Sequence, residues 1–271
     1  MIIDGNYFQI NFNKKYGQNF ITDKNLLAAI AEDAGVTQED TVIEIGAGAG
    51  TLTAALSDRA KRVIAYEIDD ALRPVLEKTL ASRENVRVVF EDFLKKSEPL
   101  PHSFKVVANL PYYVTTPIVM RLLEGEERPE SVTVMVQKEV AERLTAAPGT
   151  AEYGAITASL DLVANAEITR IVGRQCFMPP PNVDSAVVRI DLTHKGYTEQ
   201  EIACARKIIR AAFNMRRKTL SNGLASLFGG KEGANRVIEK AGFSSSVRGE
   251  TLSAADYVLL ARAALALGLI G

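Results

Sequence analysis

Short apolar runs alternate with stretches of helical spacing over the first two thirds of the chain, and this alternation constrains the fold more than any other feature. Strands separated by helices form a parallel sheet with helices on both faces. Seven runs read as strands, the last two at the sheet edge: Thr41–Ile45, Arg62–Ile68, Val86–Phe90, Phe104–Ala108, Ser131–Gln137, Glu167–Val172 and Ala186–Leu192. The helical stretches are Thr51–Ser57, Asp70–Leu80, Pro117–Leu123, Lys138–Ala146 and Ala155–Val163. We therefore predict an α/β domain with a mostly parallel, seven-stranded sheet.

The pattern changes near residue 194, where a short linker, Thr193–Gly196, precedes a region of purely helical periodicity. No strand is expected there. The expected helices are Glu201–Phe213, Leu220–Phe228, Ala234–Ala241 and Ser253–Leu267. The last helix should end at Gly268, since glycine adopts the left-handed conformation that closes many helices. We predict two domains, the α/β domain at 1–193 and a small all-helical domain at 194–271.

The composition excludes several classes of protein. No apolar run approaches the ~20 residues of a membrane span, and the chain starts without a basic and apolar leader. We therefore expect a cytoplasmic protein with no membrane segment, and a monomer by default. Cys176 and Cys204 have no metal-ligand spacing, and His102 and His194 lie far from any acidic or cysteine cluster. A metal site or a histidine-based triad is not expected.

A glycine-rich segment follows the first predicted strand. Gly46, Gly48 and Gly50 form a G-x-G-x-G pattern at a strand-to-helix turn, where a ligand can approach a backbone that has no Cβ atoms. The dinucleotide fingerprint is G-x-G-x-x-G, and Thr51 stands where its last glycine would be. A phosphate-poor ligand such as S-adenosylmethionine fits this tighter pattern better than NAD does.

Acidic residues end the next two strands. Glu67 lies 21 residues after Gly46, where a carboxylate can accept hydrogen bonds from both hydroxyls of a ribose. Asp92 follows the third strand and can accept a hydrogen bond from an adenine amine, although an aspartate there can equally cap a helix or a turn. The residue after each, Ile68 and Phe93, is counted with the cofactor site.

Asn109-Leu110-Pro111-Tyr112 follows the fourth strand and is the most informative motif in the chain. The amine of adenine is a poor nucleophile because its lone pair is delocalised into the ring. Acceptors for its two N–H groups favour rehybridisation, and the Asn109 side-chain oxygen and the Leu110 carbonyl can be those acceptors, with Pro111 restricting the backbone. Tyr112 can stack on the base, and such stacking is worth roughly 1–3 kcal/mol.

A second aromatic residue would complete a base sandwich. Phe177 precedes a proline-rich loop that would hold the ring stiffly, although it can also simply fill the core. The net charge is −1, yet residues 201–250 contain ten Lys and Arg against four Asp and Glu. This basic segment is either a solvated helix face or a nucleic-acid grip. Its residues, with one further arginine, are Arg206, Lys207, Arg210, Arg216, Arg217, Lys218 and Arg248.

With these motifs the chain resembles the KsgA/RsmA family of ribosomal RNA adenine dimethyltransferases almost from end to end. The matching segments are Lys15–Ile21, Glu44–Gly50, Glu67, Asp92, Asn109–Tyr112, Phe177–Ser185 and Phe213–Leu220. The resemblance implies a Rossmann-like methyltransferase domain that uses S-adenosylmethionine and releases S-adenosylhomocysteine. It implies transfer to two adjacent adenines near the 3′ end of 16S rRNA in the small ribosomal subunit, giving N6,N6-dimethyladenosine.

The resemblance also implies roles for particular residues. Asn19 and Ile21 would contact the cofactor, Gly46 its methionine end, Glu67 its ribose and Asp92 its adenine, and Gly48 is counted with the cofactor site. Asn109 would lie between the cofactor and the target amine. Ile21 stands where the family commonly has Leu, and Tyr113-Val114 where Asn-Ile is frequent.

Three other functions remain open from the sequence. A related enzyme that methylates large-subunit RNA shares the Asn-x-Pro-aromatic motif, whereas DNA adenine methyltransferases usually have Asp at the position of Asn109. A binding protein that acts in subunit assembly could keep the same fold without needing methyl transfer. An NAD-dependent oxidoreductase would use the glycine segment and Glu67 but leave Asn109–Tyr112 without a purpose.

Overall fold

The computed structural model describes residues 2–3, 6–7, 19–111 and 114–270, and the chain divides into two compact units. The first consists of Met1–Ala141 and Glu167–Leu192, and the second of Glu142–Ala166 and Thr193–Gly271. Packing thus groups residues 142–166 with the C-terminal helices, whereas the sequence pattern predicted them as part of the α/β domain. The functional boundary at residues 193 and 194 stays a prediction.

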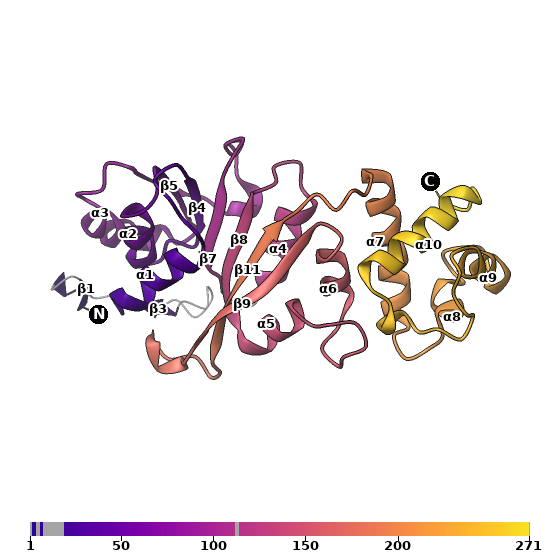
Figure 1. Cartoon of the computed structure of the whole chain (residues 1–271). Coiled ribbons are helices and arrows are strands. Elements are labelled where there is room, and N and C mark those ends of the chain that lie inside the picture. Colours follow the sequence, from indigo (N-terminus) through magenta and orange to yellow (C-terminus); the bar gives the residue numbers. More distant parts are fainter. Residues whose placement is uncertain (1, 4–5, 8–18, 112–113, 271) are drawn as a thin grey trace. The chain divides into compact units, whose positions relative to one another are not determined.

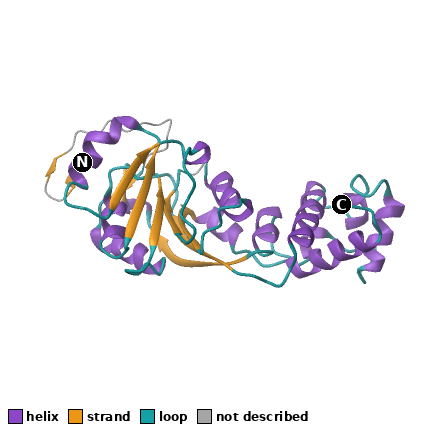
Figure 2. Cartoon of the chain, turned by 90° about the horizontal axis from the view of Figure 1, so that it is seen from above, coloured by secondary structure: helices purple, strands orange, loops and turns teal. Residues whose placement is uncertain are grey.

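The first unit is built on one seven-stranded sheet in the order β6-β5-β4-β7-β8-β11-β9. Most of these strands are labelled in Figure 1, and Figure 2 shows the sheet in orange. The pairs β6–β5, β5–β4, β4–β7 and β7–β8 are parallel, and β8–β11 is antiparallel. The mostly parallel sheet, with the last two strands at one edge, is confirmed. Its strands are β4 (Thr41–Ile45), β5 (Arg62–Glu67), β6 (Val86–Phe90), β7 (Lys105–Asn109), β8 (Ser131–Gln137), β9 (Ala164–Val172) and β11 (Ser185–Leu192).

Both faces of the sheet centre are buried. On one face, Val42, Val63 and Val107 join a core cluster with residues of α1 (Lys24–Asp33), α2 (Thr51–Ser57) and α3 (Arg73–Thr79). Their neighbours along the strands, Ile43 and Val106, are also fully buried and point to the opposite face, because side chains alternate along a strand. Burial on both faces explains why these strands are nearly continuous apolar runs.

Helix α1 was not among the expected elements. Its signals are an Asp23 cap that accepts hydrogen bonds from the N–H groups of Asn25 and Leu26, and an apolar pattern at Leu27, Ile30 and Ala31. The expected helix Asp70–Leu80 is instead a 3-10 turn, Asp70–Leu72, followed by α3. Pro74 stands in the first turn of α3, where a missing N–H costs nothing.

Two short strands connect segments that are far apart in sequence. β3 (Phe20–Ile21) pairs antiparallel with β10 (Phe177–Met178), with Phe177 opposite Ile21 and Met178 opposite Phe20. β1 (Ile2–Ile3) pairs with β2 (Asn6–Tyr7). Two residues carry no recognisable strand period, so the sequence did not predict either pair. The first unit also contains α4 (Thr115–Glu124). Helix α5 (Lys138–Leu144) includes the boundary between the two units, which falls between residues 141 and 142.

The second unit is helical, with α6 (Ala155–Leu160), α7 (Glu199–Asn214), α8 (Leu220–Leu224), α9 (Lys231–Lys240) and α10 (Ala254–Ala266). Capping boxes begin α7 and α10, at Thr198 and Ser253. Gly268, with φ of 64°, follows the end of α10 as expected. Helix α8 ends four residues before the predicted Phe228, because the chain tightens into a turn in which the Leu227 N–H donates to the Leu224 carbonyl.

Buried aromatic residues hold this unit together. Tyr153 and Tyr257 are fully buried, and Phe213 contacts both rings, with centroid distances of 5.8 Å and 6.5 Å. Their hydroxyls donate to the carbonyls of Leu252 and Gly249. No helix in the described part of the chain is long and apolar enough to cross a membrane.

Candidate active site

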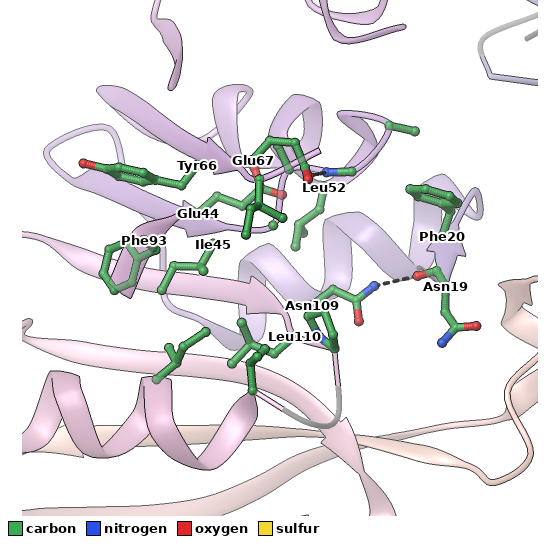
Figure 3. Close-up of a pocket in the computed structure, with 18 of the residues that line it drawn as sticks. Asn19, Phe20, Glu44, Ile45, Leu52, Tyr66, Glu67, Phe93, Asn109 and Leu110 are labelled. Atoms are coloured by element: carbon green, nitrogen blue, oxygen red, sulfur yellow. Dashed lines mark hydrogen bonds between the residues drawn. The ribbon is translucent and has the colours of Figure 1, made fainter. Parts of the chain in front are cut away.

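A pocket lies at the carboxyl ends of four neighbouring parallel strands, β6, β5, β4 and β7 (Figure 3). Residues 44–49, 66–68, 91–94 and 109–111, which end these strands, line it together with residues 19–21. Open α/β sheets bind their ligands at this edge. The structure therefore brings the predicted cofactor residues together with Asn109, Leu110 and Pro111 in one pocket.

The glycine segment forms the turn between β4 and α2. Gly46, Gly48 and Gly50 have φ values of 82°, 57° and 80°, in the left-handed region that favours glycine. The Gly46 N–H donates to the Tyr66 carbonyl at 2.8 Å, which joins the turn to the end of β5. A Cβ atom on Gly48 would lie 2.9 Å from the Phe20 ring, so the absence of a side chain also admits the N-terminal segment.

Glu67 joins the same turn through its carboxylate. Its Oε2 accepts a hydrogen bond from the Gly48 N–H at 2.7 Å (Figure 3). Its Oε1 accepts one from the Asp69 N–H at 2.8 Å. Burial raises the pKa of Glu67 above its ordinary value despite these bonds. Each carboxylate oxygen has two lone pairs, so Glu67 keeps acceptor capacity toward the pocket that it lines.

Glu44 also lines the pocket and was not predicted as a site residue. It is completely buried, and neither of its oxygens has a hydrogen-bond partner among the described residues. Burial raises the pKa of Glu44 to about 8. The nearby Thr53 hydroxyl favours the charged carboxylate and acts to lower the pKa, whereas the neighbouring Glu67 charge acts to raise it. The sequence signal that could have identified Glu44 as a site residue was an acidic side chain at a buried position of the otherwise apolar strand β4.

Asp92 has the capping role that the sequence left open, since its Oδ1 accepts from the Leu94 N–H at 3.0 Å at the start of a 3-10 turn. Asp92 also lines the pocket, which is compatible with a contact to the cofactor adenine, and that contact stays a prediction. Phe93 is buried edge-to-face against Tyr66, and Ile68 is 49% exposed at the pocket. These two side chains make the pocket wall at Asp92 apolar.

Asn109 ends β7 and projects its side chain into the pocket region (Figure 3). Its Nδ2 donates to the Asn19 backbone carbonyl at 2.9 Å, and its Oδ1 has no partner among the described residues. The carbonyl of Leu110 likewise accepts no hydrogen bond from them. Pro111 lines the pocket, and Tyr112 lies outside the described residues. Asn109 and Leu110 thus each have one acceptor, the amide Oδ1 and the backbone carbonyl, without a hydrogen-bond partner among the described residues.

Phe177 is placed differently from the other predicted site residues. It is 5% exposed, belongs to the core cluster with Phe20 and Ile21, and is not among the residues that line the pocket. This position matches the alternative in which Phe177 fills the core. Its predicted stacking on a base stays untested.

The basic residues belong to the second unit. Lys207 and Arg210 are exposed on α7, where Arg206 is half-buried, and Arg217 and Lys218 are exposed in the turn that follows. Arg248 is exposed and pairs with Thr219 in an isolated bridge beside that turn. Neither Arg217 nor Lys218 forms an ion pair with any described residue.

Arg216 differs from its neighbours because its guanidinium is occupied within the unit. Its Nε donates to Glu250 at 2.9 Å, and its Nη2 donates to the carbonyls of Thr150 and Ala151 at 3.1 Å and 2.8 Å. The Gly149 N–H donates to the Glu250 carbonyl beside it. Arg216 therefore holds the loop before α6, and its predicted RNA contact stays a prediction.

Together, the mostly parallel sheet, the glycine turn after β4 and the acidic residue that ends β5 define a Rossmann-like domain, the class of fold to which S-adenosylmethionine-dependent methyltransferases belong. The described residues contain no cluster of histidine, cysteine and acidic side chains that could hold a metal ion. Residues 9–262 match the family model described as Ribosomal RNA adenine dimethylase, and the chain belongs to this family.

Curated relatives agree with this assignment over nearly the whole chain. The chain is 44% identical to the Ribosomal RNA small subunit methyltransferase A of Ligilactobacillus salivarius, with 97% of this chain and 93% of that protein covered. It is also 44% identical to the protein of the same name from Clostridium botulinum (strain Loch Maree), with 93% and 94% covered.

Two solved structures share the fold across both units. A dimethyladenosine transferase from Plasmodium falciparum has a TM-score of 0.81 and 25% identity, covering 92% of this chain and 98% of that one. The 23S rRNA methyltransferase ErmE has a TM-score of 0.73 and 27% identity, covering 90% and 99%. The predicted family and fold class are thereby confirmed.

Proposed function

We propose that this protein transfers methyl groups from S-adenosylmethionine to the N6 amines of two adjacent adenines near the 3′ end of 16S rRNA. The substrate would be the small ribosomal subunit or its precursor, and the products N6,N6-dimethyladenosine and S-adenosylhomocysteine. One observation carries the proposal: the Asn109 Oδ1 and the Leu110 carbonyl are two unoccupied acceptors beside the glycine turn. The small-subunit methyltransferase relatives support the choice of RNA.

The pocket residues fit the cofactor by their chemistry. Gly46 and Gly48 lack the Cβ atoms that would obstruct its methionine end, and the spare lone pairs of Glu67 can accept from the ribose hydroxyls. Asp92 can accept from the adenine amine. The pocket wall contains Asn19, Ile21, Ile68 and Phe93. Bound S-adenosylmethionine supplies a methyl group that is already activated on a sulfonium.

The chain contributes positioning and electrostatic stabilisation. Hydrogen bonds from the target amine to Asn109 and Leu110 would make its lone pair available and stabilise the positive charge that develops on nitrogen. Tyr112 is the residue that we propose to stack on the base. Phe177 was predicted to cover the opposite face of the base, and its burial favours an anchoring role instead.

The exposed cations of the helical unit, Lys207, Arg210, Arg217, Lys218 and Arg248, are proposed to bind phosphates. Residues 1–193 would then be the catalytic domain and residues 194–271 the RNA-binding domain. We further propose that the protein acts as a cytoplasmic monomer without a metal ion.

The direct test is transfer of labelled methyl groups from S-adenosylmethionine to undermethylated small subunits and to naked 16S rRNA, followed by nucleoside analysis. We expect N6,N6-dimethyladenosine. Asn109→Ala should reduce transfer by roughly a hundredfold or more, because it removes a transition-state acceptor. Binding to the subunit should stay close to that of the native protein. A folded, cofactor-binding protein that produces no dimethyladenosine would refute the proposal.

Methylation of large-subunit RNA is the second candidate, because ErmE shares the fold with a TM-score of 0.73. The same assay with purified 23S rRNA separates the two. Label in 23S rRNA but not in small subunits would favour this candidate.

A further inference from the structure

The side chain of Asn109 has one permitted orientation. Its Nδ2 faces the backbone carbonyl of Asn19 at 2.9 Å, and a carbonyl can only accept a hydrogen bond (Figure 3). The amide nitrogen must therefore point to Asn19, and the oxygen is left at the opposite side of the amide. A flipped amide would present N–H groups to the target amine, which is itself a donor.

The position of the Asn19 carbonyl is in turn fixed by contacts of the two residues that follow it in the chain. The Ile21 carbonyl accepts a hydrogen bond from the Thr51 hydroxyl at 2.8 Å, which ties β3 to the first residue of α2. The Phe20 ring lies over Gly48, where a Cβ would approach it to 2.9 Å. The segment Asn19–Ile21 is thus attached directly to the glycine turn and to the helix after it.

The third attachment comes from the region before the proline-rich loop. β10 pairs with β3, with Phe177 opposite Ile21, and both side chains are buried, at 5% and 3% exposure. Phe20, Ile21 and Phe177 belong to one core cluster. Burial of Phe177 beside β3, rather than in the pocket, gives its ring an anchoring function.

We propose that the segment Asn19–Ile21 is a positioning element that orients the Asn109 amide, and that Thr51 and Phe177 act on catalysis through it. This inference rests on the proposed function, since the amide oxygen is oriented toward a target amine. Thr51 and Phe177 are positioning residues, because no contact of theirs with the reacting atoms is required.

Asn109→Asp tests the donor half of this arrangement. Aspartate keeps acceptor oxygens for the target amine but has no N–H for the Asn19 carbonyl, which it would repel. We expect kcat at saturating S-adenosylmethionine and small subunits to fall by roughly a hundredfold, the order that follows from a misplaced reacting group. Native kcat in Asn109→Asp, with the native protein active, would overturn the inference and leave the proposed function intact.

Thr51→Val removes the hydroxyl but keeps the shape, and Thr51→Ser keeps the hydroxyl. We expect Thr51→Val to lower kcat about tenfold, and Thr51→Ser to stay within about twofold of the native protein. In the Asn109→Asp background Thr51→Val should cost nothing further, because the amide that it orients is absent. Equal losses in both backgrounds would indicate a merely structural role and overturn the inference.

A readout without turnover separates this inference from the proposed function. The Asn109 side-chain NH₂ signals, assigned by their disappearance in Asn109→Asp, should shift in Thr51→Val and not in Thr51→Ser. Unchanged signals in Thr51→Val would overturn the inference even if the protein methylates adenine. Inactivity of the native protein, by contrast, would refute the proposed function.

Discussion

At the scale of single residues, the pocket combines buried carboxyl groups with acceptors that lack partners. Glu67 accepts hydrogen bonds from two backbone N–H groups, whereas the Glu44 carboxyl has no hydrogen-bond partner in the part of the chain that the structure describes. An unpartnered buried carboxyl is stable only when it holds its proton, because burial disfavours the charged form. Glu44 therefore makes the folded state sensitive to pH.

Glu44→Gln is expected to flatten the pH dependence of stability. The folded pKa of Glu44, about 8, lies above the ordinary value of 4.5, so the folded state binds more protons between these values. The native protein should lose stability relative to Glu44→Gln as pH rises through this range, by up to about 1.4 kcal/mol per pH unit. Urea unfolding across the range measures it, with the exposed Glu39→Gln as the control. Parallel profiles for the native protein and Glu44→Gln would contradict the expectation.

At the scale of elements, the turn between β4 and α2 is where the pocket and the N-terminal segment meet. Gly48 serves both, since its N–H binds Glu67 and its Cα faces the Phe20 ring. A side chain there would meet an unfavourable φ and an aromatic ring at once.

Gly48→Ala should destabilise the protein by about 2 kcal/mol or more, from left-handed strain of roughly 1–2 kcal/mol plus the displacement of Phe20. Gly196→Ala is the matched control, because Gly196 also has a positive φ, 75°, but has open space around it. Thermal or urea unfolding compares the two. Gly48→Ala should also weaken S-adenosylmethionine binding in calorimetry, and Gly196→Ala should not. Equal losses of stability in Gly48→Ala and Gly196→Ala would show that displacing the Phe20 ring does not destabilise the protein, which contradicts the expectation.

At the scale of the whole molecule, each compact unit has its own core, and the basic residues belong to the helical one. Within the short basic motif Arg216-Arg217-Lys218, the first residue is bound within the unit and the other two are exposed. Arg216 binds Glu250 and the loop at Thr150, whereas Arg217 and Lys218 are exposed to solvent.

This separation predicts opposite outcomes for neighbouring substitutions. Arg217→Ala should weaken RNA binding and reduce the slope of log affinity against log salt by about one, as expected for one lost phosphate contact. Arg216→Ala should leave that slope unchanged and lower the unfolding free energy by about 1–2 kcal/mol through its lost hydrogen bonds. Fluorescence anisotropy over a salt series and urea unfolding measure the two. A reduced slope in Arg216→Ala would show that Arg216 contacts RNA, as the sequence predicted.

Local patterns along the chain were enough to predict most of the sheet, the glycine turn and the placement of Glu67, Asp92 and Asn109 at strand ends. A buried strand or a tight turn is specified by residues that are adjacent in the sequence, so it can be recognised without knowing the fold. Helix α1 has such signals as well, in Asp23 and in the apolar spacing that follows it.

Tertiary structure alone decided the features that join distant segments. The pairing of Phe20–Ile21 with Phe177–Met178, the hold of Asn19 on Asn109 and the clamp by Arg216 each link residues at least 34 positions apart. The packing of residues 142–166 with the C-terminal helices is of the same kind. A single side chain or a two-residue strand has no periodicity, so its partner is specified only when the core closes around it. The position of Asn109 and Leu110 at the end of a strand was thus readable in the sequence, and the hydrogen bond that orients the Asn109 amide was not.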